Sequence, residues 1–145
     1  ECYLHLNRYA EARDMARQVI EEYRALGASY EAARTLLYLA TAEAELANFA
    51  AAQAALDEAE PVYQSLGATT WAATVYLRRG RIALQQGDVD TARAQAKAAV
   101  AAFQSNNRQV NYAEAILLDA QASFIDGSIH AAENAGMVAW QIARP

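Results

Sequence analysis

The sequence predicts an all-α fold, an α-solenoid built from antiparallel helix pairs. Two observations support this prediction. Ala accounts for 37 of the 145 residues, against six Gly and two Pro, so strong helix formers dominate and few residues interrupt them. In addition, one hexapeptide recurs at a spacing of forty residues, and a fixed period of this length is typical of stacked helical repeats.

The hexapeptide is clearest at residues 87–92, which read GDVDTA. Weaker copies begin at Asn7 (NRYAEA), Ala47 (ANFAAA) and Gly127 (GSIHAA), and the sixth position is Ala in every copy. The copies define a single array over residues 1–145, with three repeats at about 7–46, 47–86 and 87–126 and partial units at both ends. Because the chain opens on Glu1 within a helical pattern, we expect it to be a fragment of a longer protein.

Apolar residues at helical spacing predict seven helices after the terminal segment 1–6. Their expected ranges are about 9–26, 30–46, 49–66, 70–86, 89–105, 110–125 and 129–143. Gly27, Gly67 and Asn107 follow three of these helices, and both residue types tolerate the left-handed backbone that ends a helix. The short connections favour antiparallel neighbours.

Short polar residues precede several of the predicted helices and are expected to cap them. These residues are Ser29, Asn48, Asp88 and Ser128. Pro61 lies inside the predicted helix 49–66, where it removes a backbone hydrogen bond. We expect a kink near residues 57–61, and a break with Pro61 restarting the helix is the alternative.

The turn motif, Gly-x-aromatic-x-x-Ala between two helices, resembles the tetratricopeptide repeat. The small residue that this family has in its first helix matches Ala40, Gly80 and Ala120, and the large residue one turn earlier matches Leu36, Tyr76 and Ile116. The Ala late in its second helix matches Ala59, Ala99 and Ala139. The family's Leu before the small residue is kept at Leu39 but becomes Arg79 and Asp119. The forty-residue period is similar to the long repeats of bacterial signalling proteins, among them sensor solenoids and arrays associated with caspase-like proteases.

The resemblance implies a right-handed superhelix whose concave surface is lined by the first helix of each pair. Three stripes occupy equivalent positions on those helices: Arg34, Tyr38, Thr41, Glu45; Thr74, Arg78, Arg81, Gln85; Glu114, Leu118, Gln121, Ile125. These positions are our candidate partner-binding site. Arg78, Arg79 and Arg81 cluster on an otherwise acidic chain, and guanidinium groups suit carboxylates or phosphates. The alternative is a solvated face with ion pairs to Glu45 or Glu114.

The repeat register also predicts the packing. Small residues should meet across each helix pair, with Ala12, Ala52, Ala92 and Ala132 facing Ala40, Gly80 and Ala120. Bulky residues should fill the space between units: Leu36, Leu37, Tyr76, Leu77, Ile116, Leu117, Ile20, Tyr23, Leu56, Tyr63, Val100 and Phe103. Apolar residues at the two ends, Tyr3, Leu4, Leu6, Val138, Trp140 and Ile142, should remain uncovered. We expect them to meet other parts of the full protein or to drive self-association.

Composition argues against several classes of function. The net charge is −5 with both signs interspersed, which disfavours nucleic-acid binding. No apolar run is long enough for a membrane span. The lone Cys2 forms no disulfide framework, so we expect a cytoplasmic protein. His5 and His130 fall in different units, and neither has ligand spacing, so we expect no metal and no cofactor.

The sequence therefore predicts a non-catalytic scaffold that binds a protein or peptide along its first helices. Two alternatives remain open. The array could sense an effector within a transcriptional or signalling regulator. It could also be the recruiting arm of a protease whose catalytic domain lies elsewhere. No residue pair in the sequence points to acid–base or nucleophilic catalysis within these residues.

Overall fold

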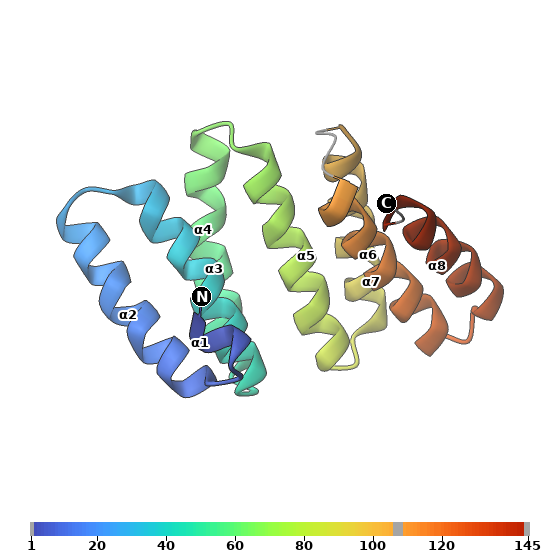
Figure 1. Ribbon diagram of the computed structural model, residues 1–145, viewed down its shortest axis with the longest axis horizontal. Helices are drawn as coiled ribbons and strands as arrows, with labels where there is room; N and C mark the ends of the chain where they lie inside the picture. The colour runs from blue at the N-terminus through green and yellow to red at the C-terminus, as the bar shows by residue number, and fades with distance from the viewer. Residues whose placement is uncertain (1, 106–108, 144–145) are drawn as a thin grey trace. The chain divides into compact units, whose positions relative to one another are not determined.

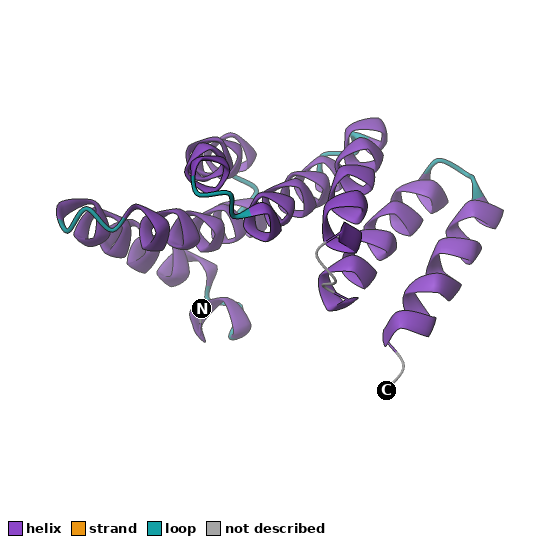
Figure 2. Ribbon diagram, turned by 90° about the horizontal axis from the view of Figure 1, so that it is seen from above, coloured by secondary structure: helices purple, strands orange, loops and turns teal. Residues whose placement is uncertain are grey.

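A computed structural model describes residues 2–105 and 109–143, and these residues are helical apart from short turns (Figures 1 and 2). The helices are α1 (Cys2–His5), α2 (Tyr9–Ala25), α3 (Ser29–Glu45), α4 (Phe49–Ser65), α5 (Thr69–Gln85), α6 (Val89–Ser105), α7 (Gln109–Ile125) and α8 (Ile129–Ala143). The predicted helix boundaries agree with these to within one residue. The all-α fold of antiparallel-packed helices is therefore confirmed.

The chain divides into two compact units, Glu1–Ala68 and Thr69–Pro145. In the first unit, α2 packs on α3 and α3 packs on α4. In the second unit, α5, α6, α7 and α8 pack in succession, and α5 also contacts α7. Each unit is thus a stack of helix pairs, while a single array through both units stays a prediction.

Left-handed residues end the helices as predicted at two of the three expected positions. The φ angles of Gly27 and Gly67 are +68° and +63°, and Asn107 lies outside the described residues. After α2, the amide of Ala28 donates to the carbonyl of Tyr23 at 2.9 Å, and that of Gly27 donates to Arg24 at 3.1 Å. This pair of bonds satisfies carbonyl groups that the helix end leaves open.

The capping predictions hold at one position and fail at two others. The Asp88 carboxylate accepts a hydrogen bond from the Thr91 amide at 3.0 Å. Hydrogen bonding by the Thr91 side chain, and secondly by its amide, lowers the pKa of Asp88 below its ordinary value. Ser29 is wrong as a cap, because it is already the first residue of α3. Asn48 precedes α4 as expected but makes no capping bond, since its side-chain amide donates to Glu43 instead. Ser128 directly precedes α8.

Pro61 does not interrupt α4, which runs from Phe49 to Ser65 with the proline inside it. The alternative of a break at Pro61 is therefore wrong. The ring lies on the exposed side of the helix.

Small residues bring the paired helices close together. Ala12, Ala52 and Ala92 are buried and Ala132 is half-buried, and the small residues of the first helices, Ala40, Gly80 and Ala120, are buried as well. A Cβ atom added at Gly80 would lie 3.2 Å from the carbonyl oxygen of Ala92. Close approach of α5 and α6 at this point therefore depends on the missing side chain.

The predicted bulky residues are buried or half-buried with one exception, Leu117, which is 46% exposed. Among the residues expected at the ends, Leu6, Val138 and Trp140 are exposed, whereas Tyr3, Leu4 and Ile142 are half-buried. Among the described residues, no helix combines the length and apolar character needed to cross a bilayer.

Candidate functional site

The first helices of the second unit, α5 and α7, contact each other directly and carry two of the three predicted stripes. On α5, Arg81 and Gln85 are exposed, while Thr74 and Arg78 are half-buried. On α7, Gln121 and Ile125 are exposed and Glu114 is half-buried. The structure therefore brings these two stripes to neighbouring helices of one unit.

An open cavity of about 480 Å³ lies between the C-terminal halves of α5 and α7. We call this cavity the α5/α7 groove. It is lined by Leu84, Leu117, Ala120, Gln121, Phe124 and Ile125. Phe124 and Ile125 are 65% and 59% exposed, so large apolar side chains face solvent around the groove. Among the described residues that line the groove, Gln121 is the only one with a polar side chain.

An ion pair joins the two helices one turn before the groove. The Arg81 guanidinium lies 3.5 Å from the Glu114 carboxylate, and both side chains are about half exposed. Arg81 and Glu114 each lie three residues before a groove residue, Leu84 and Leu117. The predicted alternative of a local ion pair to Glu114 is thus present for Arg81. Such a solvated pair contributes little to stability. A ligand could therefore replace one partner of the pair at a small cost in free energy.

The sequence placed Leu118 in the binding stripe and Leu117 between units, and both assignments are wrong. Leu118 is 2% exposed, in a core cluster with Leu77, Phe103 and Ala115. A Cβ atom at Gly80 would lie 2.6 Å from its Cδ2 atom. Leu118 therefore fills the space that Gly80 leaves open, and this turns Leu117 toward the groove.

The remaining stripe belongs to α3 in the first unit. Arg34 and Glu45 are exposed, and Tyr38 and Thr41 are half-buried. The Thr41 hydroxyl donates to the Leu37 carbonyl at 3.0 Å, as the Thr74 hydroxyl on α5 does to Thr70 at 3.0 Å. These two threonine hydroxyls thus bond to their own helix one turn back. Binding by the α3 stripe remains a prediction.

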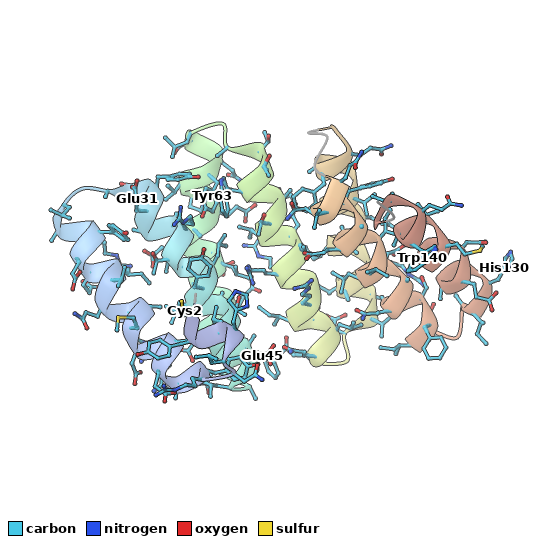
Figure 3. All side chains as sticks on the ribbon, viewed as in Figure 1. Cys2, Glu31, Glu45, Tyr63, His130 and Trp140 are labelled. Atoms are coloured by element: carbon cyan, nitrogen blue, oxygen red, sulfur yellow. The ribbon has the colours of Figure 1, made fainter. Side chains whose placement is uncertain are left out.

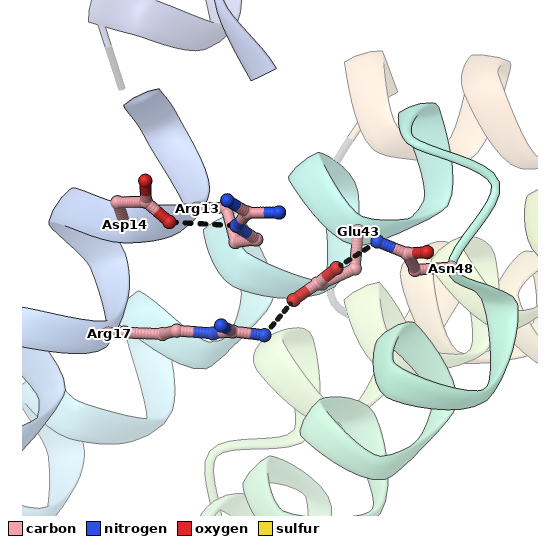
Figure 4. Close-up of polar contacts among 5 residues, drawn as sticks. All are labelled: Arg13, Asp14, Arg17, Glu43 and Asn48. Atoms are coloured by element: carbon pink, nitrogen blue, oxygen red, sulfur yellow. Dashed lines mark hydrogen bonds and ion pairs between the residues drawn. The ribbon is translucent and has the colours of Figure 1, made fainter. Parts of the chain in front are cut away.

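A buried carboxylate in the first unit was missed from the sequence. Glu43 on α3 is 1% exposed; it accepts hydrogen bonds from Arg17 on α2 at 2.6 Å and from the side chain of Asn48 at 2.8 Å (Figure 4). Its counterparts forty and eighty residues later are Ala83 and Ser123, both small and buried. The sequence could have indicated this buried carboxylate, because Glu43 is a charged residue at a repeat position that is otherwise occupied by small residues. The three side chains tie α2, α3 and the start of α4 together.

Within the described residues, no group of three or more His, Cys, Asp or Glu side chains could hold a metal ion. His130 on α8 lies 4.0 Å from Glu133, the residue one turn later, and both are exposed. Cys2 is exposed rather than buried in a core, contrary to the usual behaviour of a lone cysteine.

Antiparallel helices, most of them 17 residues long and joined by turns with left-handed residues, define a helical-repeat fold. No protein-family model and no curated protein sequence matches the chain. Among solved structures, it is similar to BtubC (BKLC) from P. vanneervenii, with a TM-score of 0.83 and 20% sequence identity. The match covers 97% of this chain and 58% of that chain, so the chain spans just over half the length of BtubC. The likeness shows the fold, a tetratricopeptide-like helical repeat.

Proposed function

We propose that the chain is a non-catalytic interaction module that binds a peptide segment of another protein in the α5/α7 groove. One observation carries this proposal: Leu117, Phe124 and Ile125 leave large apolar surfaces exposed around a cavity. Exposed apolar patches beside a concavity are typical of binding sites on otherwise soluble surfaces. The elements that form the groove are first helices, which the repeat register assigned to partner binding.

The lining favours a peptide over a small polar effector. About 480 Å³ accommodates one or two apolar side chains, and burying each one contributes roughly 1.5–3 kcal/mol. A polar effector needs several convergent hydrogen-bonding groups, and in the part of the lining that the structure describes only Gln121 has a polar side chain. An amide can both donate to and accept from a peptide backbone. The chemistry therefore matches a peptide with an apolar anchor.

The ion pair beside the groove adds a charge preference. Arg81 is about half exposed and lies 3.5 Å from Glu114, a long separation for a charge-assisted bond. A ligand carboxylate placed about one turn from the anchor can approach Arg81 and compete with Glu114. The preferred ligand is a short segment with an apolar anchor and an acidic residue near it.

The test begins with selection of binding peptides from a random library displayed on phage, using the whole chain as bait. We expect enrichment of large apolar residues, and binding of the selected peptides is then measured by fluorescence anisotropy. Phe124→Ser and Leu117→Ser should each weaken binding about tenfold or more, because each removes apolar contact area. Both side chains are well exposed, so thermal unfolding should change little.

Val110→Ser is the matched control for these variants. Val110 is also apolar, 74% exposed and on α7, but it lies about 20 Å from Phe124 along the helix. Its substitution should leave peptide binding unchanged. Equal binding by wild type, Phe124→Ser and Leu117→Ser would refute the groove as the site.

A further inference from the structure

A cluster of charged side chains lies in the first unit, where α2 meets the end of α3. Figure 4 shows Arg13 and Arg17 of α2 together beside Glu43 of α3, and Glu45, labelled in Figure 3, marks the end of that helix. Arg13 and Arg17 are four residues apart, so they share one face of α2. We call these two residues the α2 arginine pair. They lie on a second helix, so they are separate from the predicted stripes on first helices.

The buried carboxylate of Glu43 holds one member of the pair in place. One of its oxygens accepts from Arg17 at 2.6 Å, and the other accepts from the side chain of Asn48 at 2.8 Å. The bond uses one of the three guanidinium nitrogens of Arg17, whose side chain is 58% exposed. Two guanidinium groups thus lie beside one buried carboxylate, which leaves one positive charge in excess.

Asp14 balances this excess charge from the solvent side. Its carboxylate accepts from Nε of Arg13 at 2.8 Å, and its side chain is 64% exposed. The bond to Arg13 lowers the pKa of Asp14, and the charge of Arg17 acts in the same direction, so Asp14 senses both guanidinium groups. Because a solvated ion pair contributes little to stability, another carboxylate can replace Asp14 at a small cost in free energy.

The second unit shows how the same repeat position binds an acidic residue. Arg93, the counterpart of Arg13, donates to the Ser123 hydroxyl at 3.2 Å and pairs with Asp126 at 3.2 Å. In the first unit, the position of Asp126 is occupied by Leu46. The side chains of Arg13 and Arg93 are 29% and 26% exposed, so the two guanidinium groups are similarly accessible. The acidic residue that Arg93 meets after the next helix is therefore replaced by an apolar one in the first unit.

We propose that the α2 arginine pair binds an acidic side chain of a partner protein, which displaces Asp14. The planar fork of a guanidinium group matches a carboxylate, and the bonds to Asp14 and Glu43 use one nitrogen of each arginine. A single negative charge balances the one positive charge that Glu43 leaves on the pair, whereas a doubly charged phosphate exceeds it. The pair belongs to the first unit and the α5/α7 groove to the second, so neither proposal depends on the other.

Nuclear magnetic resonance of the whole chain, with isotope-labelled arginine side chains, tests the proposal. The probes are acetyl-Gly-Glu-Gly-amide and its counterpart acetyl-Gly-Gln-Gly-amide, which has no carboxylate. The Glu peptide should shift the Nε–H signals of Arg13 and Arg17 until they saturate, and the Gln peptide should leave them unchanged. Arg13→Gln should weaken binding of the Glu peptide about fivefold, because it removes one charged donor group.

Asp14→Asn is the decisive variant, because it removes the competing carboxylate and a gain in affinity cannot arise from unfolding. It should tighten binding of the Glu peptide about threefold. Glu22→Gln is the matched control. Glu22 is exposed on the same helix, eight residues further along, and accepts from Gln18. Its substitution removes the same charge away from the pair and should leave the affinity unchanged.

The proposal is overturned if wild type and Asp14→Asn bind the Glu peptide equally. Equal tightening by Asp14→Asn and Glu22→Gln would also overturn it, because net charge alone would then explain the effect. Signals of Arg13 and Arg17 that shift with inorganic phosphate but not with the Glu peptide would show that the ligand class is wrong.

Discussion

At the scale of single residues, left-handed backbone marks the helix ends. In the described turns, positive φ angles occur at Asn7, Gly27, Ala47, Gly67, Gly87 and Gly127, with values from 55° to 80°. The first five are spaced by twenty residues, half of the sequence repeat. Four of the six residues are Gly, which adopts this conformation without steric cost. Ala47 adopts it with a φ of +59°, so its Cβ atom is strained there.

Ala47→Gly should therefore stabilise the first unit by about 1 kcal/mol. The substitution removes a left-handed penalty of roughly 1–2 kcal/mol, of which the greater freedom of Gly in the unfolded chain offsets part. Chemical denaturation followed by circular dichroism measures the difference.

Ala54→Gly provides the control for this prediction. Ala54 is exposed and lies in the middle of α4, so the same change should destabilise by roughly 0.5–1 kcal/mol. If both substitutions destabilise equally, the conformation assigned to Ala47 is wrong.

Residue-level prediction from the sequence succeeded where one residue type decides the outcome. Gly27 and Gly67 could be assigned from their place after Leu26 and Leu66, because few other residues end a helix in this way. The sequence alone could not show which of Leu117 and Leu118 is buried, because both fit an apolar helix face. The outcome depends on the space opened by Gly80 on another helix, which only the folded structure specifies.

At the scale of helices, the junction of α2, α3 and α4 depends on a buried charge. The side chain of Glu43 is 2% exposed, while that of its partner Arg17 is 58% exposed. Burying a carboxylate requires compensation by a counterion and hydrogen bonds. Arg17 and Asn48 provide this compensation. Losing the exposed partner should therefore cost more than losing the buried residue.

Arg17→Met should destabilise the chain by about 2–3 kcal/mol, because it leaves Glu43 buried without its counterion. Glu43→Ala should cost less, roughly 1 kcal/mol, since Arg17 and Asn48 can turn to water and alanine occupies the equivalent position 83. The free energy of unfolding of each variant, from urea denaturation, checks the order.

The double variant Arg17→Met with Glu43→Ala is the decisive comparison. It should be more stable than Arg17→Met alone, because no uncompensated charge remains buried. Additive effects of the two substitutions would contradict the coupling.

The helices themselves could be predicted almost completely from the sequence, since the repeat fixes their length and phase and alanine favours helix throughout. The caps were less predictable. Asn48 fits the preference for a capping position, but Glu43 competes for its amide across the turn. A tertiary contact thus overrides the local preference of Asn48 for capping the helix.

At the scale of the whole molecule, charge differs between the two units. The first unit contains five basic and eleven acidic residues, and the second contains seven basic and six acidic residues. The net charge of −5 is therefore carried by the first unit. The α5/α7 groove belongs to the second unit, whose own charges nearly cancel.

The candidate site was only partly predictable. The register selected the first helices, and two of the selected residues, Gln121 and Ile125, line the α5/α7 groove, while their part in binding stays a prediction. It missed Leu84, Leu117 and Phe124, because a family pattern specifies which face is concave but not which residues leave space uncovered. The chemistry of the proposed ligand was argued from that space, so it could not be predicted from the sequence.

The central claim is that the α5/α7 groove holds the apolar anchor of a peptide. Nuclear magnetic resonance tests it most directly, with isotope-labelled protein bound to an unlabelled peptide from the phage selection. Nuclear Overhauser contacts should join the anchor side chain of the peptide to the methyl groups of Leu84, Leu117 and Ile125 and to the ring of Phe124. Contacts confined to α6, α8 or the first unit, with none to these four residues, would contradict the account.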